Sequence, residues 1–413
     1  NANGASTKNF IDDGFTVGPL LWDVDKDTKL EIVQAGSDGF VYIWRADGSK
    51  QPNWPKKMQD GDQQRRIVSA PAVGDLDGDG NWDIVTTTTE SYDGDSFGRV
   101  YAVRASDGSA LPGFPFRLRS TRVLPLVGEG LPNSPALADL DGDGKDEVTV
   151  SGIASIPKVI RADGSGKDFI ALSNNPYGTA SNSDDVPSVI LIANPSFGDL
   201  NNDGTPDLVQ PAAGFGAAKA FAGSGKRENF DHHLDAWNLK TGKFFPGFPH
   251  RMDDWQFFMN PAVVDVDNDG KVEAISASGG YYVRAVDVSG KEPKGWPKFT
   301  GQWITSAPTL GDLDGDGKLE LVITTRSGYV FAWHTDGLVK GRVDWPTFAH
   351  DNWNSNNFNT PLEFGKRAGS GGGGGGCEIA LHGGRGVAGL AGLLLVVGAL
   401  LLVVMRRRRR QVG

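Results

Sequence analysis

Six short acidic segments recur along the chain, and each can supply oxygen ligands to a hard divalent cation. Each reads D-x-D-x-D-x-x-x-[DE], with Asn at the third position of the fourth copy. Alternate side chains of a tight loop, with a backbone carbonyl, can provide the six or seven oxygens that Ca²⁺ takes. We therefore expect up to six calcium ions, bound most weakly at the fourth loop. The candidate ligands are Asp23, Asp25, Asp27, Lys29, Glu31; Asp75, Asp77, Asp79, Asn81, Asp83; Asp139, Asp141, Asp143, Lys145, Glu147; Asp199, Asn201, Asp203, Thr205, Asp207; Asp265, Asp267, Asp269, Lys271, Glu273; Asp312, Asp314, Asp316, Lys318 and Glu320.

The spacing separates these loops from other acidic motifs. An EF-hand places its last acid at position 12 and joins two helices, whereas here the last acid is at position 9. Strand-type runs follow at once, such as LEIV at 30–33 and LELVI at 319–323. Magnesium fits less well because it keeps its waters and takes few protein ligands. Solvated acidic turns explain one copy easily, but four carboxylates within nine residues repel one another, and six copies favour a bound cation.

The sixth position of each loop predicts a sharp turn. Glycine stands there in five copies, and glycine adopts a positive φ angle without steric cost. The first loop has Thr28 at this position, so the sequence leaves its geometry open. The five glycines are Gly80, Gly144, Gly204, Gly270 and Gly317.

The loops belong to a larger repeat that predicts an all-β fold. An apolar strand, the acidic loop and a second strand are usually followed by a glycine-led strand and a Trp-Pro or Phe-Pro turn. The first aspartates recur at intervals of 47 to 66 residues, and about four strands at such a period indicate a β-propeller blade. We expect six motif-bearing blades, and a seventh if residues precede Asn1. The strand–loop–strand units are Leu20–Val33, Ala72–Val85, Ala136–Val148, Ser196–Val209, Ala262–Ile275 and Thr309–Val322.

At this point the chain resembles a known family. The phrase PAVGDLDGDG–DIV (71–85) and the loop spacing are similar to the FG-GAP/VCBS repeats of integrin α-subunit-type propellers. The resemblance covers about Gly18 to Phe358 and is strongest in the loops. It implies calcium in strand-to-strand loops of successive blades, and an extracellular binding or adhesion role. Polar or glycine-rich inserts at Gly164–Val186 and Ala212–His233 are expected to form loops on one face.

The C-terminal part of the sequence predicts a linker and a membrane-spanning segment after the propeller. Residues 1–364 are expected to form the propeller, and 365–385 a Gly/Ser-rich linker that contains Cys377, the only cysteine. Residues 386–405 are twenty uncharged, largely apolar residues, enough to span a bilayer as a helix. The arginine cluster in 406–413 then places the C-terminus in the cytoplasm. The tail resembles the myxobacterial C-terminal sorting segment, which implies export, processing or lipid modification near Cys377, and display on the bacterial cell surface.

Charge and composition exclude several functions. Residues 1–365 carry 33 basic and 50 acidic side chains, so nucleic acid and anionic lipid are unsuitable partners for the body. No disulfide can form within it, because Cys377 lies in the tail. The first residue is Asn1 rather than Met, which suggests a processed or truncated product.

Other constellations carry less weight. Asp231, His232, His233 and His250 could bind a transition metal or act in catalysis, although a solvated loop is the simpler interpretation. No G-x-S-x-G elbow or other standard nucleophile motif occurs. Tryptophans beside proline could line a sugar-binding surface, but their repeated position favours packing between blades. These are Trp54, Trp296 and Trp345.

The sequence therefore predicts a membrane-anchored calcium propeller that binds a protein or glycan outside the cell. A polysaccharide lyase or hydrolase on a calcium propeller is the alternative enzyme hypothesis, and a structural envelope component is the third. An enzyme needs a cleft of paired carboxylates or basic residues apart from the calcium loops, and the sequence indicates none. The ligand, the blade number and the oligomeric state stay open.

Overall fold

A computed structural model describes most of the predicted propeller. It covers residues 14–60, 65–90, 97–120, 130–163, 165, 167–174, 188–214 and 232–367. Regular secondary structure within these ranges consists of β-strands alone, so the all-β prediction is confirmed. None of the described residues forms a helix that could cross a membrane. The predicted membrane span, Cys377 and the linker from residue 368 onward lie outside the described ranges.

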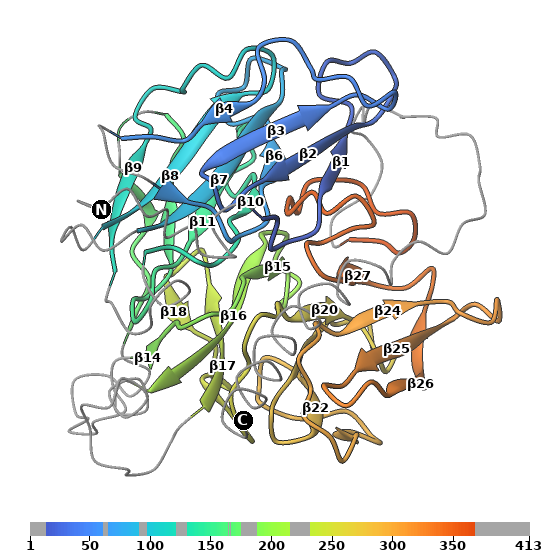
Figure 1. Cartoon of the computed structure of the whole chain (residues 1–413). Helices are drawn as coiled ribbons and strands as arrows, with labels where there is room; N and C mark the ends of the chain where they lie inside the picture. The colour runs from blue at the N-terminus through green and yellow to red at the C-terminus, as the bar shows by residue number, and fades with distance from the viewer. Residues whose placement is uncertain are drawn as a thin grey trace, which may run out of the picture.

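The strands form six antiparallel sheets, which we call blades 1 to 6 (Figure 1). Blade 1 contains β1 (Leu20–Trp22), β2 (Glu31–Ala35), β3 (Phe40–Trp44) and β4 (Lys56–Lys57). Blade 2 contains β5 (Arg65–Arg66), β6 (Ala72–Gly74), β7 (Asp83–Glu90), β8 (Phe97–Arg104) and β9 (Phe116–Arg119). Blade 3 contains β10 (Ala136–Ala138), β11 (Glu147–Val150), β12 (Lys158–Ile160) and β13 (Asp168–Ile170).

The second half of the ring continues this plan. Blade 4 contains β14 (Ser188–Val189), β15 (Ser196–Gly198), β16 (Asp207–Gly214), β17 (His232–Asn238), β18 (Lys243–Phe244) and β19 (His250–Met252). Blade 5 contains β20 (Ala262–Val264), β21 (Glu273–Ala277), β22 (Tyr282–Val286) and β23 (Lys298–Phe299), joined by β27 (Val343–Trp345). Blade 6 contains β24 (Thr309–Gly311), β25 (Lys318–Thr324) and β26 (Val330–Leu338).

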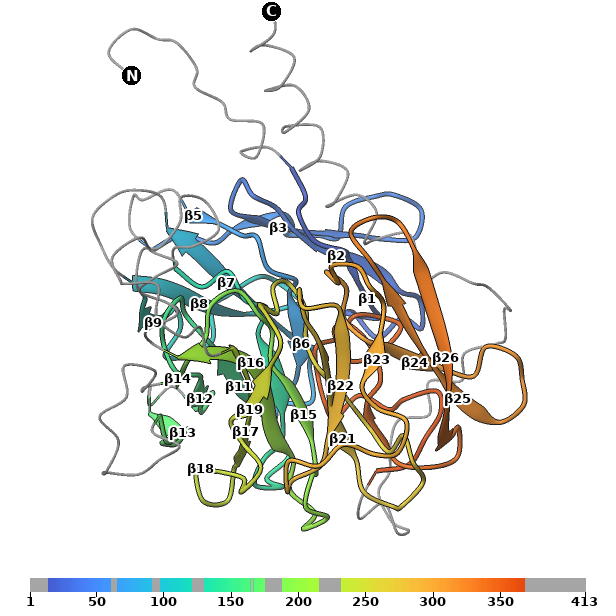
Figure 2. The same ribbon diagram turned by 90° about the horizontal axis from the view of Figure 1, so that it is seen from below.

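Each acidic loop joins the two strands of its predicted strand–loop–strand unit, as β1 to β2 in blade 1 and β24 to β25 in blade 6. We call the strand before the loop the first motif strand of its blade. In five blades the two ends of the predicted unit are cross-strand partners, as in Leu20 with Val33 and Thr309 with Val322. In blade 3, Ala136 pairs with Thr149, one residue beyond the predicted end of the unit. The cyan sheets and the orange sheets lie on opposite sides of the molecule in both views (Figures 1 and 2). The fold is a β-propeller with six motif-bearing blades.

Apolar side chains from neighbouring blades share the core. Val41 and Ile43 of blade 1 belong to the same buried cluster as Ile84 of blade 2. The Trp54 Nε1 donates a hydrogen bond of 2.8 Å to the carbonyl of Ala105 in blade 2. Burying a Val or Leu side chain contributes about 1.5–3 kcal/mol. The prediction that the tryptophans beside proline pack between blades is confirmed. Trp54 and Trp345 are buried in clusters that contain side chains of neighbouring blades, and Trp296 is half-buried against such a cluster.

Blade 6 differs from the others on the side where a next blade would pack. Val330 is 59% exposed, whereas its counterparts Val41, Val100 and Val283 are 0% exposed. Ile32 on the facing side of blade 1 is 38% exposed. No hydrophobic cluster of the described residues contains side chains from both blade 1 and blade 6. Whether a seventh blade exists stays a prediction.

A non-repeating segment, residues 343–360, contacts the first motif strand of every blade. We call it the central segment; it is red in Figure 1. Its β27 pairs with β20, and its Phe358 ring lies 6.4 Å from the Phe197 ring of β15. Its carbonyls accept backbone N–H groups from β1, β6, β10 and β24. The four accepting residues are Trp353, Ser355, Asn356 and Pro346. Trp345 was predicted to lie at the closing turn of a repeat, but it belongs to β27, which pairs with β20 of blade 5. The remainder of the segment carries no repeat signature and was not predicted.

One buried carboxyl fixes the central segment to blade 3. Asp146 accepts hydrogen bonds from the Asn357 Nδ2 at 2.8 Å and the Asn359 Nδ2 at 2.6 Å. Burial raises the pKa of Asp146 to about 7, although both amide contacts act to lower it. The contact therefore joins two parts of the chain that are more than 200 residues apart.

Replacement of Trp345 by Ala should destabilise the whole ring, because the side chain is 0% exposed and packs between blades. A buried Trp-to-Ala change costs about 3–5 kcal/mol. Trp303 is 38% exposed and serves as the matched control, with an expected loss of about 1 kcal/mol or less. Denaturant unfolding monitored by circular dichroism compares the two variants. Equal losses would contradict a central role for residue 345.

Candidate metal centre

The last acid of every loop closes the loop from inside the protein. This ninth-position carboxylate is buried and accepts the backbone N–H of the second-position residue, at 2.8–3.1 Å. The contact recurs in all six loops, so the loops share one geometry. The six donor–acceptor pairs are Val24–Glu31, Leu76–Asp83, Leu140–Glu147, Leu200–Asp207, Val266–Glu273 and Leu313–Glu320.

The other acids shape the outer part of the loop. The first-position aspartate accepts backbone N–H groups from within its own loop, as Asp75 does from Gly78 and Gly80 at 2.8 Å. The fifth-position acid accepts the N–H of the seventh-position residue in every copy. We predicted those seventh-position residues as ligands through their carbonyls, and that role stays a prediction. Their N–H groups are engaged at 2.7–3.0 Å in Lys29, Asn81, Lys145, Thr205, Lys271 and Lys318.

Positive φ angles occur at the fourth and sixth positions of every loop. Glycine or Asn fills most of these positions, but the first loop uses Lys26 (φ 59°) and Thr28 (φ 73°). The first loop therefore has the same backbone as its siblings, although the sequence left its geometry open. A β-branched residue in this region is strained.

The described loops bring their carboxylates together. In six groups of three or more side chains, the possible ligand atoms lie within 4.8 Å of one another. Clustered carboxylate oxygens on a pre-shaped loop fit a hard cation such as Ca²⁺. Five of these groups are Asp23, Asp25, Asp27; Asp75, Asp77, Asp83; Asp139, Asp141, Glu147; Asp265, Asp267, Asp269; and Asp314, Glu320, His334.

In the fourth loop, the carboxylate of Asp203 already has partners within the protein. The Asn201 Nδ2 donates to an Oδ2 of Asp203 at 3.0 Å, and the Lys240 Nζ lies 2.9 Å from the other oxygen of Asp203. The ammonium of Lys240 offsets the charge of Asp203 in part, and the Asn201 amide adds a hydrogen bond. This agrees with the expectation that the fourth loop binds a cation most weakly, which itself stays a prediction.

Arginines at the end of the third strand are functional residues that the sequence analysis missed. Arg104 lies 2.7 Å from Asp77, and Arg161 lies 3.0 Å from Asp141. Arg45 approaches Asp25 at 3.8 Å. The signal was present, because an arginine follows the third strand in each of the first three repeats. These charges offset part of the repulsion among the carboxylates, so the repulsion alone argues less strongly for a cation than the sequence suggested.

Burial raises the pKa of the ninth-position acid in the first five loops, and neighbouring carboxylates add to the effect. The pKa rises to about 7 for Glu31, Asp83 and Glu147. It rises to about 8 for Asp207 and Glu273. A cation bound near neutral pH must therefore displace protons from these groups.

The histidine constellation is not a solvated loop, and that interpretation was wrong. His232 and His233 are buried in β17, and the ends of the predicted insert Ala212–His233 belong to β16 and β17. The His232 ring lies 4.4 Å from the Trp255 ring, so packing against the sheet buries it. Burial lowers the pKa of His250, which begins β19. Asp231 lies outside the described residues.

Together the fold and the loops define a class: β-propellers whose blades each carry an acidic nine-residue loop between two strands. Residues 23–86 and 265–323 match the family model of the FG-GAP-like repeat. The chain thus carries FG-GAP-like repeats, as the loop motif predicted. No curated protein matches the sequence. The resemblance of the tail to a myxobacterial sorting segment stays a prediction.

Solved structures offer only a distant comparison. BBS1N, crystallised in complex with ARL6DN, is 12% identical with a TM-score of 0.43, over 81% of this chain and 83% of that one. The V. cholerae biofilm matrix protein Bap1 is 14% identical with a TM-score of 0.38, over 82% and 81%. The Bacillus licheniformis rhamnogalacturonan lyase PL11 is 17% identical with a TM-score of 0.39, over 80% and 69%. At these values the likeness carries no argument about function.

Replacing Thr28 by Gly should stabilise the chelator-treated protein, because Gly removes the strain of a positive φ at a β-branched residue. The expected gain is about 0.5–1 kcal/mol, since glycine also adds freedom to the unfolded chain. The reciprocal Gly80→Thr should cost about 1–2 kcal/mol. Denaturant midpoints measure both changes. A lower midpoint for the Thr28→Gly variant would contradict the shared backbone geometry.

The metal-free protein should lose stability as pH rises from about 5 to 8. The buried acids hold protons more tightly when folded, with pKa values of about 7 to 8 against a reference of 3.8 to 4.5. The folded state therefore carries extra protons in this window, and removing them destabilises it. Melting temperatures in chelator at several pH values test this. With excess calcium the fall should vanish or reverse, and a rise in chelator would contradict it.

Proposed function

We propose that the chain is a calcium-stabilised recognition propeller that binds a protein or glycan at the cell surface. The observation that supports it most is the sixfold recurrence of a closed, carboxylate-rich loop with one hydrogen-bonded geometry. All six loops join equivalent strands, so they lie at the same end of their blades. Such loops serve as scaffold, because the bound ion would fix the connection between two core strands.

Calcium would be held by the chain's own oxygen atoms. Carboxylates at the first, third, fifth and ninth positions supply most of the required ligands, and calcium contributes charge that offsets their repulsion. The ninth-position acid is already oriented by its hydrogen bond to the second-position N–H. A cation would therefore bind to a loop that needs little reorganisation.

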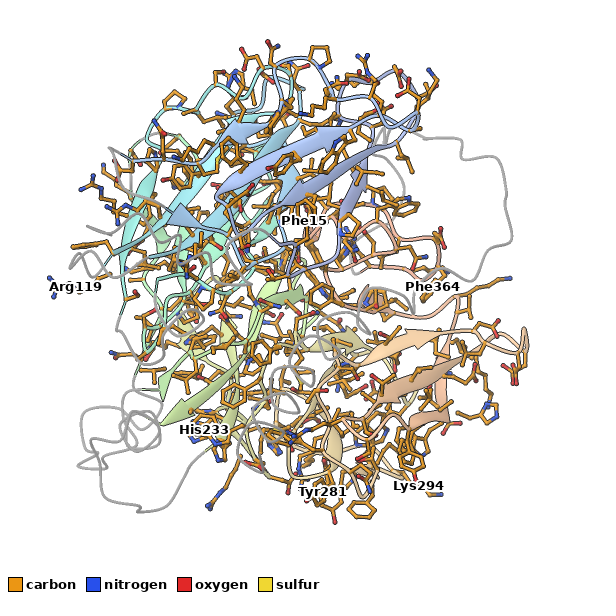
Figure 3. The ribbon with its side chains drawn as sticks, in the orientation of Figure 1. Phe15, Arg119, His233, Tyr281, Lys294 and Phe364 are labelled. Atoms are coloured by element: carbon orange, nitrogen blue, oxygen red, sulfur yellow. The ribbon has the colours of Figure 1, made fainter. Side chains whose placement is uncertain are left out.

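In this proposal, the ligand binds at the end of the blades that lies opposite the acidic loops. The hairpins between the second and third strands and the connections that leave the fourth strands lie there, because antiparallel strands alternate in direction. Exposed aromatic side chains gather in these connections and at the end of β23, and Figure 3 places Tyr281 at the margin of the molecule. They are Phe258, Tyr281, Phe299, Trp303 and Tyr329.

Exposed aromatic groups of this kind favour a macromolecular partner over a small buried substrate. Rings that protrude from a protein surface supply contact area at low entropic cost. The Arg326 guanidinium lies 5.1 Å from the Trp303 ring centre, which adds a cationic group to the same surface. Display at the cell surface is supported by residues 386–405 and the arginines that follow.

A glycan array combined with turnover assays on pectin-like polymers tests the recognition role. Binding that is lost in a Tyr281→Ala/Trp303→Ala double variant, and kept in an Asp107→Ala control, is the expected result. Product formation from a polymer would instead favour the enzyme hypothesis. Neither binding nor turnover would favour a structural envelope component.

Chelation of calcium should lower the melting temperature markedly. A ligand at 100 times its Kd stabilises a folded protein by about 2.7 kcal/mol for each site. Asp75→Ala should lose part of this calcium-dependent gain, whereas Asp107→Ala should keep it, because Asp107 lies in a turn outside the loops and bonds Ser109. Differential scanning calorimetry with and without calcium measures the gain. An unchanged melting curve after chelation would contradict structural calcium.

A further inference from the structure

The sixth acidic loop differs from its siblings by one side chain that ligates metals. His334 on β26 stands directly opposite the ninth-position acid Glu320 on β25. In blade 2 the register places Arg104 opposite Asp83 at the same point. The third strands of blades 1 and 3, β3 and β12, are likewise followed directly by an arginine, Arg45 and Arg161. Only blade 6 has an imidazole there among the six loops.

The imidazole is already held in the loop. The His334 Nδ1 lies 2.8 Å from the Glu320 Oε1, and the register of the two strands shifts between Lys318 and Glu320. Ligand atoms of Asp314, Glu320 and His334 lie within 4.8 Å of one another. The His334 side chain is 70% exposed and the Glu320 side chain 5%, so a cation has open access on one side and a buried ligand on the other.

The imidazole among the possible ligands of the sixth loop changes which metal this loop prefers. An imidazole nitrogen is a good ligand for zinc and other first-row transition metals, whereas calcium takes oxygen ligands. Arginine has no lone pair to offer and remains positively charged, so it cannot ligate a metal ion from that position. Two carboxylates and one imidazole leave positions open for water, as in a zinc site with three protein ligands.

We propose that the sixth loop binds a transition-metal dication of the zinc class through Asp314, Glu320 and His334. The proposal rests on the proposed function in one respect, namely that the loops of this chain bind divalent cations. The first three loops, in which arginine occupies the equivalent position, stay oxygen-only sites. The chain is thus a propeller with two kinds of metal site.

The test counts metals on the tag-free full chain in saturating calcium with excess Zn²⁺, after removal of unbound ions. Inductively coupled plasma mass spectrometry reads calcium and zinc on the same sample. The wild type should retain one equivalent of zinc. His334→Arg, which copies the first three loops, should retain none, and Arg104→His should gain a second equivalent. Co²⁺ absorption bands report whether nitrogen enters the coordination sphere.

The outcomes separate this proposal from the calcium role. Zinc retained equally by the wild type and by His334→Arg, or by neither, overturns the proposal. Zinc bound through His334 with no calcium elsewhere keeps the proposal and refutes the calcium scaffold. Circular dichroism confirms that the variants fold; the expectation is that they do, because position 334 is exposed.

Discussion

The whole propeller depends on one recurring contact: the buried ninth-position carboxylate that accepts the second-position N–H of its own loop. It joins the end of one core strand to the start of the next in all six blades. Because the carboxylate is desolvated, its charged form is costly unless a cation or a hydrogen-bond donor stands nearby. Arg161 lies 3.8 Å from Glu147 and His334 lies 2.8 Å from Glu320, so they meet part of this need in blades 3 and 6. Arg45, Arg104 and Lys240 pair with the outer acids Asp25, Asp77 and Asp203 instead, and a divalent cation would meet the need of the buried acids there.

Two kinds of contact stabilise the ring: packing between neighbouring blades, and bonds from the non-repeating central segment to the blades. Burial between neighbouring blades supplies the core, as in a one-dimensional repeat array, in which each unit is stabilised by its neighbours. The central segment adds contacts that no nearest-neighbour interface provides, because it bonds the first strands of distant blades. The buried Asp146 accepts hydrogen bonds from Asn357 and Asn359 and so holds the central segment against blade 3. On the exposed side of blade 6, none of the described residues forms a further blade that covers Val330.

Much of the fold followed from the sequence because the decisive contacts are local. The loop motif and its flanking strands predicted the hairpins, and the partner of Thr309 is the residue predicted. Contacts across the ring could not be predicted from spacing, so the bonds of the central segment to distant blades were missed. The salt bridge of Arg104 to Asp77 lies within blade 2, and the recurring arginine after the third strand was a signal for it that was overlooked. His232 was misplaced because a polar sequence beside an insert reads as a loop, whereas pairing with β19 and packing on Trp255 bury it. His334 could be recognised in the sequence as a possible metal ligand only by comparing the third strands of the blades with one another.

The most direct measurement is a crystal structure of the calcium-soaked propeller with anomalous scattering recorded for calcium. We expect an anomalous calcium peak in the first five acidic loops, between the third-position side chain and the buried ninth-position acid, with the first-position aspartate still bonded to its own backbone. Loops that hold only water, with Arg104 and Arg161 still paired to Asp77 and Asp141, would contradict it.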